Sequence, residues 1–303
     1  MASVDSQLKV LVAGLPGTGK STSGLSFHKA GEIEHHVWGV GEEETHGNFP
    51  GAPIKTVKLL WRDCLSDAEK DQIADDKTLE SVIDQLEEKA KYLNILRYKK
   101  YIYRVNREIE TGKRPDLKTV FVDNLTPLAD EFKSYIMAKY RADIYTAQGN
   151  FDGRKFWPKY ADELESLIRN IITLPVNVVI SSHIALSLEQ ENAAKAMDKT
   201  APTLNREWLP QIDGKLRFGI GGLFSFCFYF WCEESPGRDN KYFAKAEADD
   251  KSVGLAKCRI QPFPNPRRID ITKNEFYQQL TNAISTKTAK APQPAPQQGG
   301  NKQ

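Results

Sequence analysis

The sequence predicts an α/β fold in which a mainly parallel sheet lies between helices. A short apolar strand at residues 8–13 runs into a glycine-rich loop, and a helical segment at residues 22–30 follows. Further apolar strands at residues 118–123 and 176–181 end in polar side chains and alternate with helical segments. The chain has 303 residues, enough for one large domain or two ordinary ones.

The composition excludes several classes of protein. Hydrophobic residues make up 40% of the chain and charged residues 27%, as in soluble globular proteins. The net charge of +2 means that any surface for nucleic acid must be local. There is no signal-peptide pattern, and no apolar run approaches the roughly 20 residues of a membrane span. Four cysteines without a C-x-x-C pair agree with a reducing compartment. We therefore expect a cytoplasmic protein, in the host cytoplasm if the chain is viral, with no membrane partner.

The first half of the chain contains two further expected strands and a long helical stretch. We place the strands at residues 37–40 and 54–61, separated by a loop rich in Gly and Pro. Ser66 followed by Glu69 predicts the start of a helix. Apolar side chains then recur at helical spacing, and they are Leu79, Val82, Ile83, Leu86 and Ala90.

The second half continues the alternation of helices and strands. A helix is expected at residues 125–140, and Pro158 opens another whose apolar residues share one face. Residues 224–231 are apolar on both faces, which predicts a core strand, and residues 254–260 predict a late strand.

We expect a single domain over residues 1–284, with a helical insertion at about 62–115. The last residues, 285–303, are mainly Lys, Thr, Ala, Pro, Gln and Gly. Such a segment cannot bury enough apolar surface to fold, so we predict a disordered tail.

The glycine-rich loop is the most specific motif. Residues 14–21 read Gly-Leu-Pro-Gly-Thr-Gly-Lys-Ser and match the phosphate-binding pattern G-x-x-x-x-G-K-[ST] at every fixed position. Glycines let backbone N–H groups converge on phosphate oxygens, and the helix N-terminus adds its positive end. Lys20 would reach the β- and γ-phosphates, and Ser21 would hold Mg²⁺. The predicted nucleoside triphosphate site comprises Gly14, Leu15, Pro16, Gly17, Thr18, Gly19, Lys20, Ser21 and Thr22.

Two carboxylate positions complete the expected magnesium and water chemistry. Asp123 ends an apolar strand and would hold the metal with Ser21, although a lone Asp there can instead cap the next helix. Hydrolysis also needs a carboxylate that orients water in line with the γ-phosphate. Glu42, Glu43 and Glu44 lie at the tip of the second strand, which we expect beside the phosphate-loop strand. We favour Glu42 and then Glu43 as the base, and the choice stays open.

A histidine is the candidate sensor of the γ-phosphate. His183 follows the apolar strand at residues 176–181, where a polar group can report loss of the γ-phosphate to the next loop. A buried or capping histidine is the alternative. We see no comparable setting for the remaining histidines, His28, His35, His36 and His46.

Together these residues resemble the RecA/KaiC-like branch of phosphate-loop ATPases. Residues 122–128, V-D-N-L-T-P-L, are similar to the branch's D-S-L-T-x-L region, and residues 177–183 resemble its sensing strand. The layout is most similar to phage-encoded RecA-like ATPases of recombination and single-strand annealing, an AAA-type ATP-binding protein. The points of likeness are residues 151–154, the strand entry at Leu174, and residues 210–215.

The resemblance implies a RecA-like core, ATP and Mg²⁺ as ligands, and a catalytic glutamate at the position of Glu42. Gly39 and Gly41 depart from the more apolar family strand, which leaves the choice of glutamate uncertain. RecA-like proteins present two loops to DNA, and the corresponding segments here are residues 141–157 and 187–218. The first ends in Arg154-Lys155-Phe156-Trp157, where basic and aromatic residues suit phosphates and stacked bases. Single-stranded DNA is therefore an expected partner.

Related ring and filament ATPases complete each site with a basic residue from the neighbouring subunit, near a late strand. Lys257-Cys258-Arg259 is the matching candidate, and Arg259 in particular would stabilise charge on the transferring phosphoryl group. The alternative is a basic strand end that faces water. The resemblance thus implies a homo-oligomer, either a ring or a filament.

We predict Mg²⁺-dependent ATP hydrolysis coupled to binding of single-stranded DNA in recombination, annealing or replication. Two other classes stay open. A small-molecule or nucleotide kinase would need lid arginines and an acceptor pocket, neither of which we identify in the sequence. A non-enzymatic nucleotide switch or loading protein would bind ATP tightly, with turnover unaffected by DNA.

Overall fold

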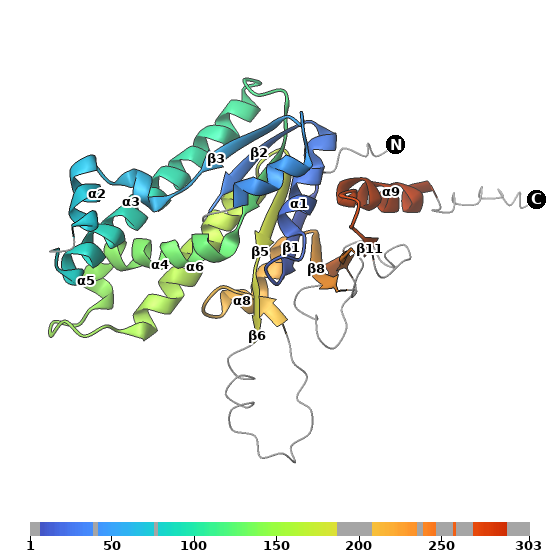
Figure 1. The fold of residues 1–303 in the computed structure, drawn as a ribbon. Coiled ribbons are helices and arrows are strands. Elements are labelled where there is room, and N and C mark those ends of the chain that lie inside the picture. Colours follow the sequence, from blue (N-terminus) through green and yellow to red (C-terminus); the bar gives the residue numbers. More distant parts are fainter. Residues whose placement is uncertain are drawn as a thin grey trace, which may run out of the picture.

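The structure is a computed structural model of the chain. It describes residues 7–38, 42–75, 78–186, 208–234, 239–246, 257–258 and 269–289. At residues 42–44, 208, 257–258 and 286–289 it describes the backbone alone. The described part is built on one large sheet with helices on both faces, and a small hairpin extends from one end (Figure 1).

The large sheet is mainly parallel, as the sequence predicts. Its strands are β1 (Lys9–Gly14), β2 (Glu32–Val37), β3 (Ile54–Lys58), β4 (Leu117–Asp123), β5 (Asn177–Ser182), β8 (Phe226–Glu233), β9 (Lys241–Lys245), β10 (Lys257–Cys258) and β11 (Ile269–Asp270). The strand order is β11-β9-β8-β1-β5-β4-β2-β3, and β10 also pairs with β8. Strands from β8 to β3 in this order pair in parallel, whereas β9, β10 and β11 are antiparallel to their neighbours. The separate hairpin joins β6 (Ile184–Leu186) and β7 (Trp208–Pro210).

Helices cover both faces of this sheet. In chain order they are α1 (Lys20–Leu25), α2 (Asp67–Ala74), α3 (Glu80–Glu110), α4 (Leu125–Lys139), α5 (Arg141–Ile144), α6 (Gly153–Ile172), α8 (Leu216–Gly219) and α9 (Phe276–Ala289). Short 3₁₀ helices are η1 (Ser26–Ala30), η2 (Glu42–Asn48), η3 (Trp61–Cys64) and η4 (Ile220–Leu223). Helices α3, α4 and α6 lie on one face, and α1 and α9 lie on the other (Figure 1).

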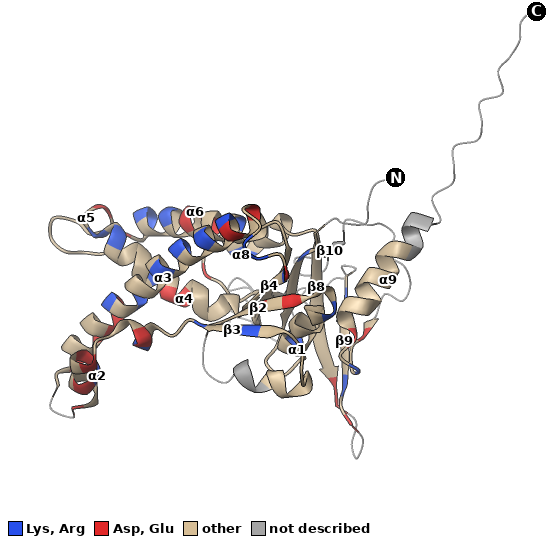
Figure 2. Cartoon of the chain, turned by 90° about the horizontal axis from the view of Figure 1, so that it is seen from above, with Lys and Arg blue, Asp and Glu red and all other residues tan. Residues whose placement is uncertain are grey.

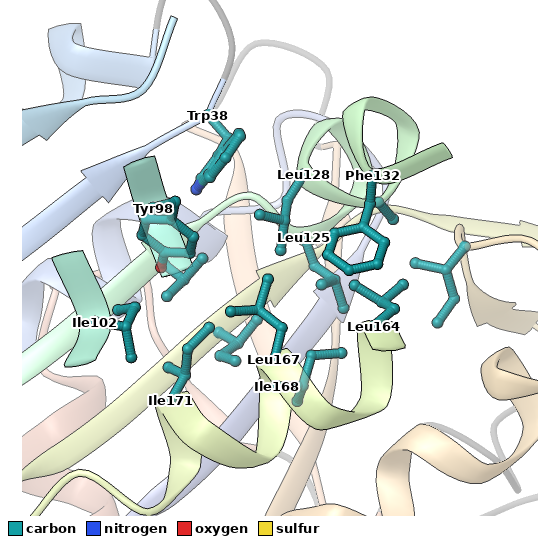
Figure 3. Packing of buried hydrophobic residues seen from close by; sticks show 14 of the residues in the cluster. Trp38, Tyr98, Ile102, Leu125, Leu128, Phe132, Leu164, Leu167, Ile168 and Ile171 are labelled. Carbon is teal, nitrogen blue, oxygen red and sulfur yellow. The ribbon is translucent and has the colours of Figure 1, made fainter. Parts of the chain in front are cut away.

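The strand period of two divides the core between the two faces. Val120 and Val122 of β4 pack with α3, α4 and α6, whereas Phe121 between them packs with α1 and α9. Figure 3 shows side chains of α4 and α6 meeting on the first face, among them Leu125, Phe132, Leu164 and Leu167. Strands β1, β4 and β5 at the centre of the sheet are therefore buried on both sides, as their nearly continuous apolar runs require.

The predicted helical segment after residue 62 is present, and the second half of its long helix packs into the core. Ser66 caps α2, since its hydroxyl accepts the Glu69 N–H while its own N–H donates to the Glu69 carboxylate at 2.8 Å. Of the expected apolar stripe in α3 only Ala90 is buried, and Leu79 is 71% exposed. The amino-terminal part of α3 extends beyond the sheet with α2, so later residues face the core (Figure 1). These are Asn94, Ile95, Tyr98, Ile102 and Val105.

Two expected boundaries are wrong. Strand β2 ends at Val37, where we expected the strand to begin. The prediction failed because buried polar residues occupy β2 and hide the apolar pattern of a strand. Helix α6 begins at Gly153 and contains Pro158 instead of starting there. The Asp152 carboxylate accepts the Arg154 N–H at 3.0 Å and so caps α6 before the proline is reached.

The carboxyl-terminal helix α9 has no counterpart in the sequence prediction. It runs to Ala289, past residue 285, where we expected ordered structure to stop. Phe276 and Leu280 are fully buried against the sheet, and they anchor the helix. Residues 290–303 lie outside the described part of the chain.

Candidate functional site

The strand order brings the predicted site residues to one edge of the sheet. Carboxyl ends of parallel strands meet at the same edge, and β5 lies between β1 and β4. The phosphate loop follows β1, His183 follows β5, and Asp123 ends β4. Strand β2 pairs with β4 and not with β1, which corrects our expectation about the strand that leads to the glutamates.

The phosphate loop has the backbone that its glycines allow. Gly17 and Gly19 have φ angles of 74° and 83°, in the left-handed region that favours glycine. A Cβ at Gly14 would lie 2.6 Å from both the Phe230 oxygen and the Thr18 hydroxyl, so no larger residue fits. The Thr18 hydroxyl donates to the Leu15 oxygen at 2.7 Å and closes the turn.

Lys20 is buried at the base of this loop. Its Nζ donates to the Gly14 oxygen at 3.0 Å and to the Leu15 oxygen at 2.7 Å. The ammonium group is thus held at the loop by neutral carbonyl oxygens. A phosphate oxygen would be a stronger acceptor, because a hydrogen bond between two charged groups is about twice as strong as a neutral one.

Asp123 is buried beside the loop and is held in its ionised form. Burial alone would raise its pKa, but hydrogen bonds with His35, Ser181 and Ser21 outweigh burial and lower the pKa below its ordinary value. The Ser181 hydroxyl donates to Oδ1, and His35 Nε2 lies 3.4 Å from Oδ2. The carboxylate therefore stays charged at neutral pH.

The residues present fit a magnesium ion. The side chains of Ser21 and Asp123 are hydrogen-bonded to each other, so a hydroxyl and a carboxylate stand side by side at the phosphate loop. Mg²⁺ prefers oxygen ligands and is usually shared between one or two protein groups and the phosphates. No group of three or more His, Cys, Asp or Glu side chains in the described ranges could hold a metal by itself.

His183 lies between the phosphate loop and Asp123. Its backbone N–H donates to the Thr126 hydroxyl at 3.2 Å, and its carbonyl accepts the Gln211 N–H at 2.8 Å. Burial and the nearby Lys20 lower the pKa of the imidazole, more than Asp123 and the Gly14 oxygen raise it. The ring is therefore neutral, and Nδ1 is buried with no hydrogen-bond partner in the described part of the chain.

Helix η2 carries the three candidate glutamates and lies next to the phosphate loop. The backbone of Glu42, Glu43 and Glu44 belongs to η2, and their side chains are not described. Thr45 and Asn48 of the same helix line the cavity of the phosphate loop. The predicted segment is at the site, while the identity of the base stays a prediction. Arg259 lies outside the described residues.

A cavity of about 420 Å³ joins these groups. Beyond the loop and Asp123, its wall includes Tyr242 from β9 and Ile271, Thr272 and Asn274 from the segment before α9. A second cavity of about 660 Å³ lies next to it and shares Asn124 and His183. The first cavity thus combines phosphate-binding groups with an aromatic and aliphatic wall, Tyr242 and Ile271, that lies against Gly19 of the loop.

Sequence reasoning missed two parts of this site. The Tyr242 wall comes from late, short elements that no motif marks. His35, for which we saw no role, contacts Asp123. The available signal was the pair of histidines in β2, because polar residues in the strand next to the one that ends at Asp123 can reach the same edge of the sheet.

Comparison with known proteins agrees with this geometry. A family model described as an AAA domain matches residues 6–217. The chain belongs to the AAA domain family. A search of curated proteins finds no match.

The AAA domain assignment makes the chain a phosphate-loop ATPase of the AAA type, with a site for a nucleotide. The matched part contains the loop, Asp123 and His183 but ends before β8, β9 and α9. Tyr242 and Asn274 therefore add a wall to the cavity from outside the family match. No helix in the described ranges is long and apolar enough to cross a membrane.

Proposed function

We propose that this AAA domain protein hydrolyses ATP with Mg²⁺ and couples hydrolysis to single-stranded DNA in recombination, annealing or replication. The main support for ATP hydrolysis with Mg²⁺ is the contact between Ser21 of the loop and Asp123 of β4, with Lys20 beside them. Lys20 and the loop amides would bind phosphates, and Ser21 and Asp123 would hold the metal. Bound Mg²⁺ would neutralise charge that develops on the phosphates.

Hydrolysis further requires a base and a sensor. We assign the base to Glu42 or Glu43, because η2 borders the cavity, and the sensor to His183. In a neutral imidazole whose Nε2–H donates to the Gly14 oxygen, the buried Nδ1 is an acceptor, so it can accept a hydrogen bond from a water molecule that also contacts a phosphate oxygen. Glu42→Gln and Glu43→Gln should separate the two candidates. The variant that loses turnover while it still binds ATP identifies the base.

The proposed DNA surface is the start of α6 and the loop before α8. Trp157 is 41% exposed and lies next to Gly214, whose added Cβ would be 3.5 Å from the indole. Arg154, Lys155 and Lys215 are exposed around it. Figure 2 shows Lys and Arg residues along α6 and α3. Phe156 is only 3% exposed, so of the two expected stacking residues Trp157 alone is accessible.

The proposed oligomer places Arg259 in the site of the neighbouring subunit. Each functional site would then combine Lys20 of one copy with Arg259 of another. Mixing Lys20→Ala with Arg259→Ala protein should restore part of the activity that each variant lacks alone. Activity that stays absent after mixing, in variants that still assemble, would contradict a shared site.

The central experiment measures ADP release by the purified chain, with Lys20→Ala as the control. Single-stranded and duplex DNA are titrated at several salt concentrations, because phosphate contacts make DNA affinity salt-dependent. We expect hydrolysis that needs Mg²⁺, falls on the order of 10²-fold in Lys20→Ala, and rises with single-stranded DNA. Lack of affinity for Mg²⁺-ATP would refute the proposal.

A small-molecule or nucleotide kinase is the second candidate. The cavity of about 660 Å³ lies where an acceptor would meet the γ-phosphate, since it shares Asn124 and His183 with the nucleotide cavity. Asp130, Lys133 and Arg217 also line it. ADP release that responds to added nucleosides but not to DNA would favour this function. ATP binding with a turnover rate that responds neither to nucleosides nor to DNA would favour a nucleotide switch.

A further inference from the structure

His35 bridges the metal-binding carboxylate and the 3₁₀ helix that follows β2. Its Nε2 lies 3.4 Å from Asp123 Oδ2, and its Nδ1 lies 2.8 Å from Nε2 of His46 in η2. His46 Nδ1 in turn lies 3.5 Å from the Thr56 hydroxyl of β3. Polar contacts therefore run without a gap from the metal site through two imidazoles to a third strand.

The register of the sheet fixes His35 in this position. His35 lies opposite Phe121 where β2 pairs with β4, and its ring stacks on the Phe121 ring at 4.9 Å with an interplanar angle of 5°. It has no exposed surface. The neighbouring His36 points to the opposite face, where it contacts Glu34 and Tyr98. Only one of the two adjacent histidines can reach the site.

The charge on Asp123 sets the direction of the hydrogen bonds. An ionised carboxylate only accepts, so Nε2 of His35 must carry a proton and donate to it. In a neutral His35, Nδ1 then accepts from Nε2–H of His46. Nδ1 of a neutral His46 can accept the Thr56 hydroxyl proton. Every donor in this arrangement meets an acceptor, with no charged imidazole required.

The far end of the bridge holds part of the cavity wall. Helix η2 packs against α1, and its residues Thr45 and Asn48 line the cavity that contains the phosphate loop. The same helix carries Glu42 and Glu43 in its first turn. Residues 39–41, which join η2 to β2, lie outside the described residues. His46 therefore supplies a side-chain link between η2 and the sheet that does not depend on that connection.

We propose that His35 and His46 are positioning residues that hold η2, and with it the candidate base, against Asp123. This inference rests on the proposed ATPase function for its kinetic consequence but not for its structural one. Loss of either imidazole should free η2 from the sheet while the phosphate loop stays intact. Turnover should then fall much more than nucleotide affinity.

The test exploits amides that replace one ring nitrogen at a time. At position 46, Gln can place its amide near the site of Nε2 and keep the contact with His35, whereas Ala cannot. At position 35, Asn can keep the contact with His46 and Gln the contact with Asp123, but neither keeps both. His36→Gln is the matched control for His35→Gln, because it changes an equally buried histidine on the other face of the sheet.

Two quantities are measured for each variant. The first is hydrogen exchange at the backbone amide of Phe49, which donates to the His46 oxygen at 2.9 Å and reports on the end of η2. The second is the pair kcat and nucleotide Kd. We expect His46→Ala to speed exchange and lower kcat by about 10- to 100-fold, the usual effect of losing a group that orients a metal ligand. Kd should change much less, and His46→Gln should recover most of both losses.

The possible outcomes separate the inference from the proposed function. If wild-type protein hydrolyses ATP and His46→Ala keeps its kcat and exchange rate, the positioning role is wrong. If wild-type protein does not hydrolyse ATP, the ATPase proposal fails, and exchange at Phe49 still decides whether His46 holds η2. Variants at position 35 provide the same comparison should His46→Ala fail to fold. Equal effects in His36→Gln would also overturn the inference, because they would indicate general loss of stability.

Discussion

The backbone nitrogen of Trp38 donates a hydrogen bond of 2.6 Å to the backbone oxygen of Asp123. The bond extends the pairing of β2 and β4 to the residue whose carboxylate enters the site. The Trp38 ring is fully buried and packs edge-on against Tyr98 of α3, with ring centroids 5.0 Å apart (Figure 3). The chain therefore leaves the sheet toward η2 from a point fixed by both backbone and side chain.

Gly24→Ala should destabilise the fold by about 1–3 kcal/mol, the usual cost of overpacking. An added Cβ would lie 2.4 Å from the Phe121 ring, which is fixed between α1 and β2. This clash should exceed the roughly 1 kcal/mol that Ala contributes to helix propensity. Urea unfolding measures the difference. Gly219→Ala in α8 is the control, because no described atom lies within 4 Å of its added Cβ. A Gly24→Ala protein as stable as wild type would contradict this packing.

Trp157→Ala should weaken binding of single-stranded DNA by about 1–3 kcal/mol, the range for loss of one stacked base. Because Trp157 is 41% exposed, the folded state should lose little stability. Phe156→Ala is the matched neighbour. It should instead lower the free energy of unfolding by about 3–5 kcal/mol, because Phe156 is buried. Fluorescence anisotropy with labelled DNA measures the DNA affinity of both variants, and urea unfolding measures their stability. Unchanged DNA affinity in Trp157→Ala would exclude stacking at this surface.

Glu131 should make stability fall as pH rises from about 4.5 to about 7. Burial between α3 and α4 raises its pKa from 4.5 to about 7, more than the hydrogen bond from Asn94 lowers it. In this window the folded state keeps a proton that the unfolded state has released, so unfolding becomes easier as pH rises. The loss should be on the order of 2–3 kcal/mol, and Glu131→Gln should remove it.

Glu163 is the control for the pH profile. Although burial alone would raise its pKa, hydrogen bonds from Lys139, Tyr140 and Lys99 lower it to about 2. Its contribution to stability is complete above pH 4.5 and lost as pH falls toward 2. Glu163→Gln should therefore leave the slope between pH 4.5 and 7 unchanged. Urea unfolding at several pH values measures both variants. If the free energy of unfolding of Glu131→Gln still falls between pH 4.5 and 7 as in the wild type, Glu131 is not the cause of that fall.

Tyr242→Ala should raise the Kd for ATP about tenfold or more, since stacking of a base on an aromatic ring contributes about 1–3 kcal/mol. The Tyr242 ring lines the cavity and lies against Gly19, 3.5 Å from where a Cβ would stand. Tyr103→Ala, at a 72% exposed position in α3, serves as the comparison. Titration with a fluorescent ATP analogue gives both constants. If Tyr242→Ala binds ATP as tightly as the wild-type protein does, the adenine base of ATP does not stack on Tyr242.

The sequence predicted the parts of the fold that rest on local pattern. The phosphate loop, the strand that ends at Asp123 and the core strand β8 are all present, because each has a motif or a continuous apolar run. Strand β2 was misplaced because Glu34, His35 and His36 are buried polar residues. Their partners on α3, β4 and η2 are 62, 88 and 11 residues away, all beyond the range of a strand's alternating pattern, so no local pattern reveals their burial.

The site was predictable only where a motif marks it. Ser21 and Asp123 are more than 100 residues apart in the sequence, and the phosphate-loop motif together with a strand that ends in Asp predicted that they meet. The structure brings the two side chains into contact, while their role as metal ligands stays a prediction. The position of β5 between β1 and β4 is a property of strand order, which sequence periodicity does not encode. Tyr242 and Asn274 reach the cavity through short antiparallel strands whose apolar runs are too brief to read.

The pairing of β8 with β1 has a practical consequence for the design of expression fragments. A protein truncated at residue 217, where the family match stops, would leave the strand that carries the phosphate loop at an open sheet edge. It would also lack Phe230, whose backbone oxygen abuts Gly14, together with the aromatic wall of β9. Exposed edges of this kind recruit other chains. Such a fragment should aggregate before its nucleotide chemistry could be assayed, so fragments for biochemical work should extend through α9.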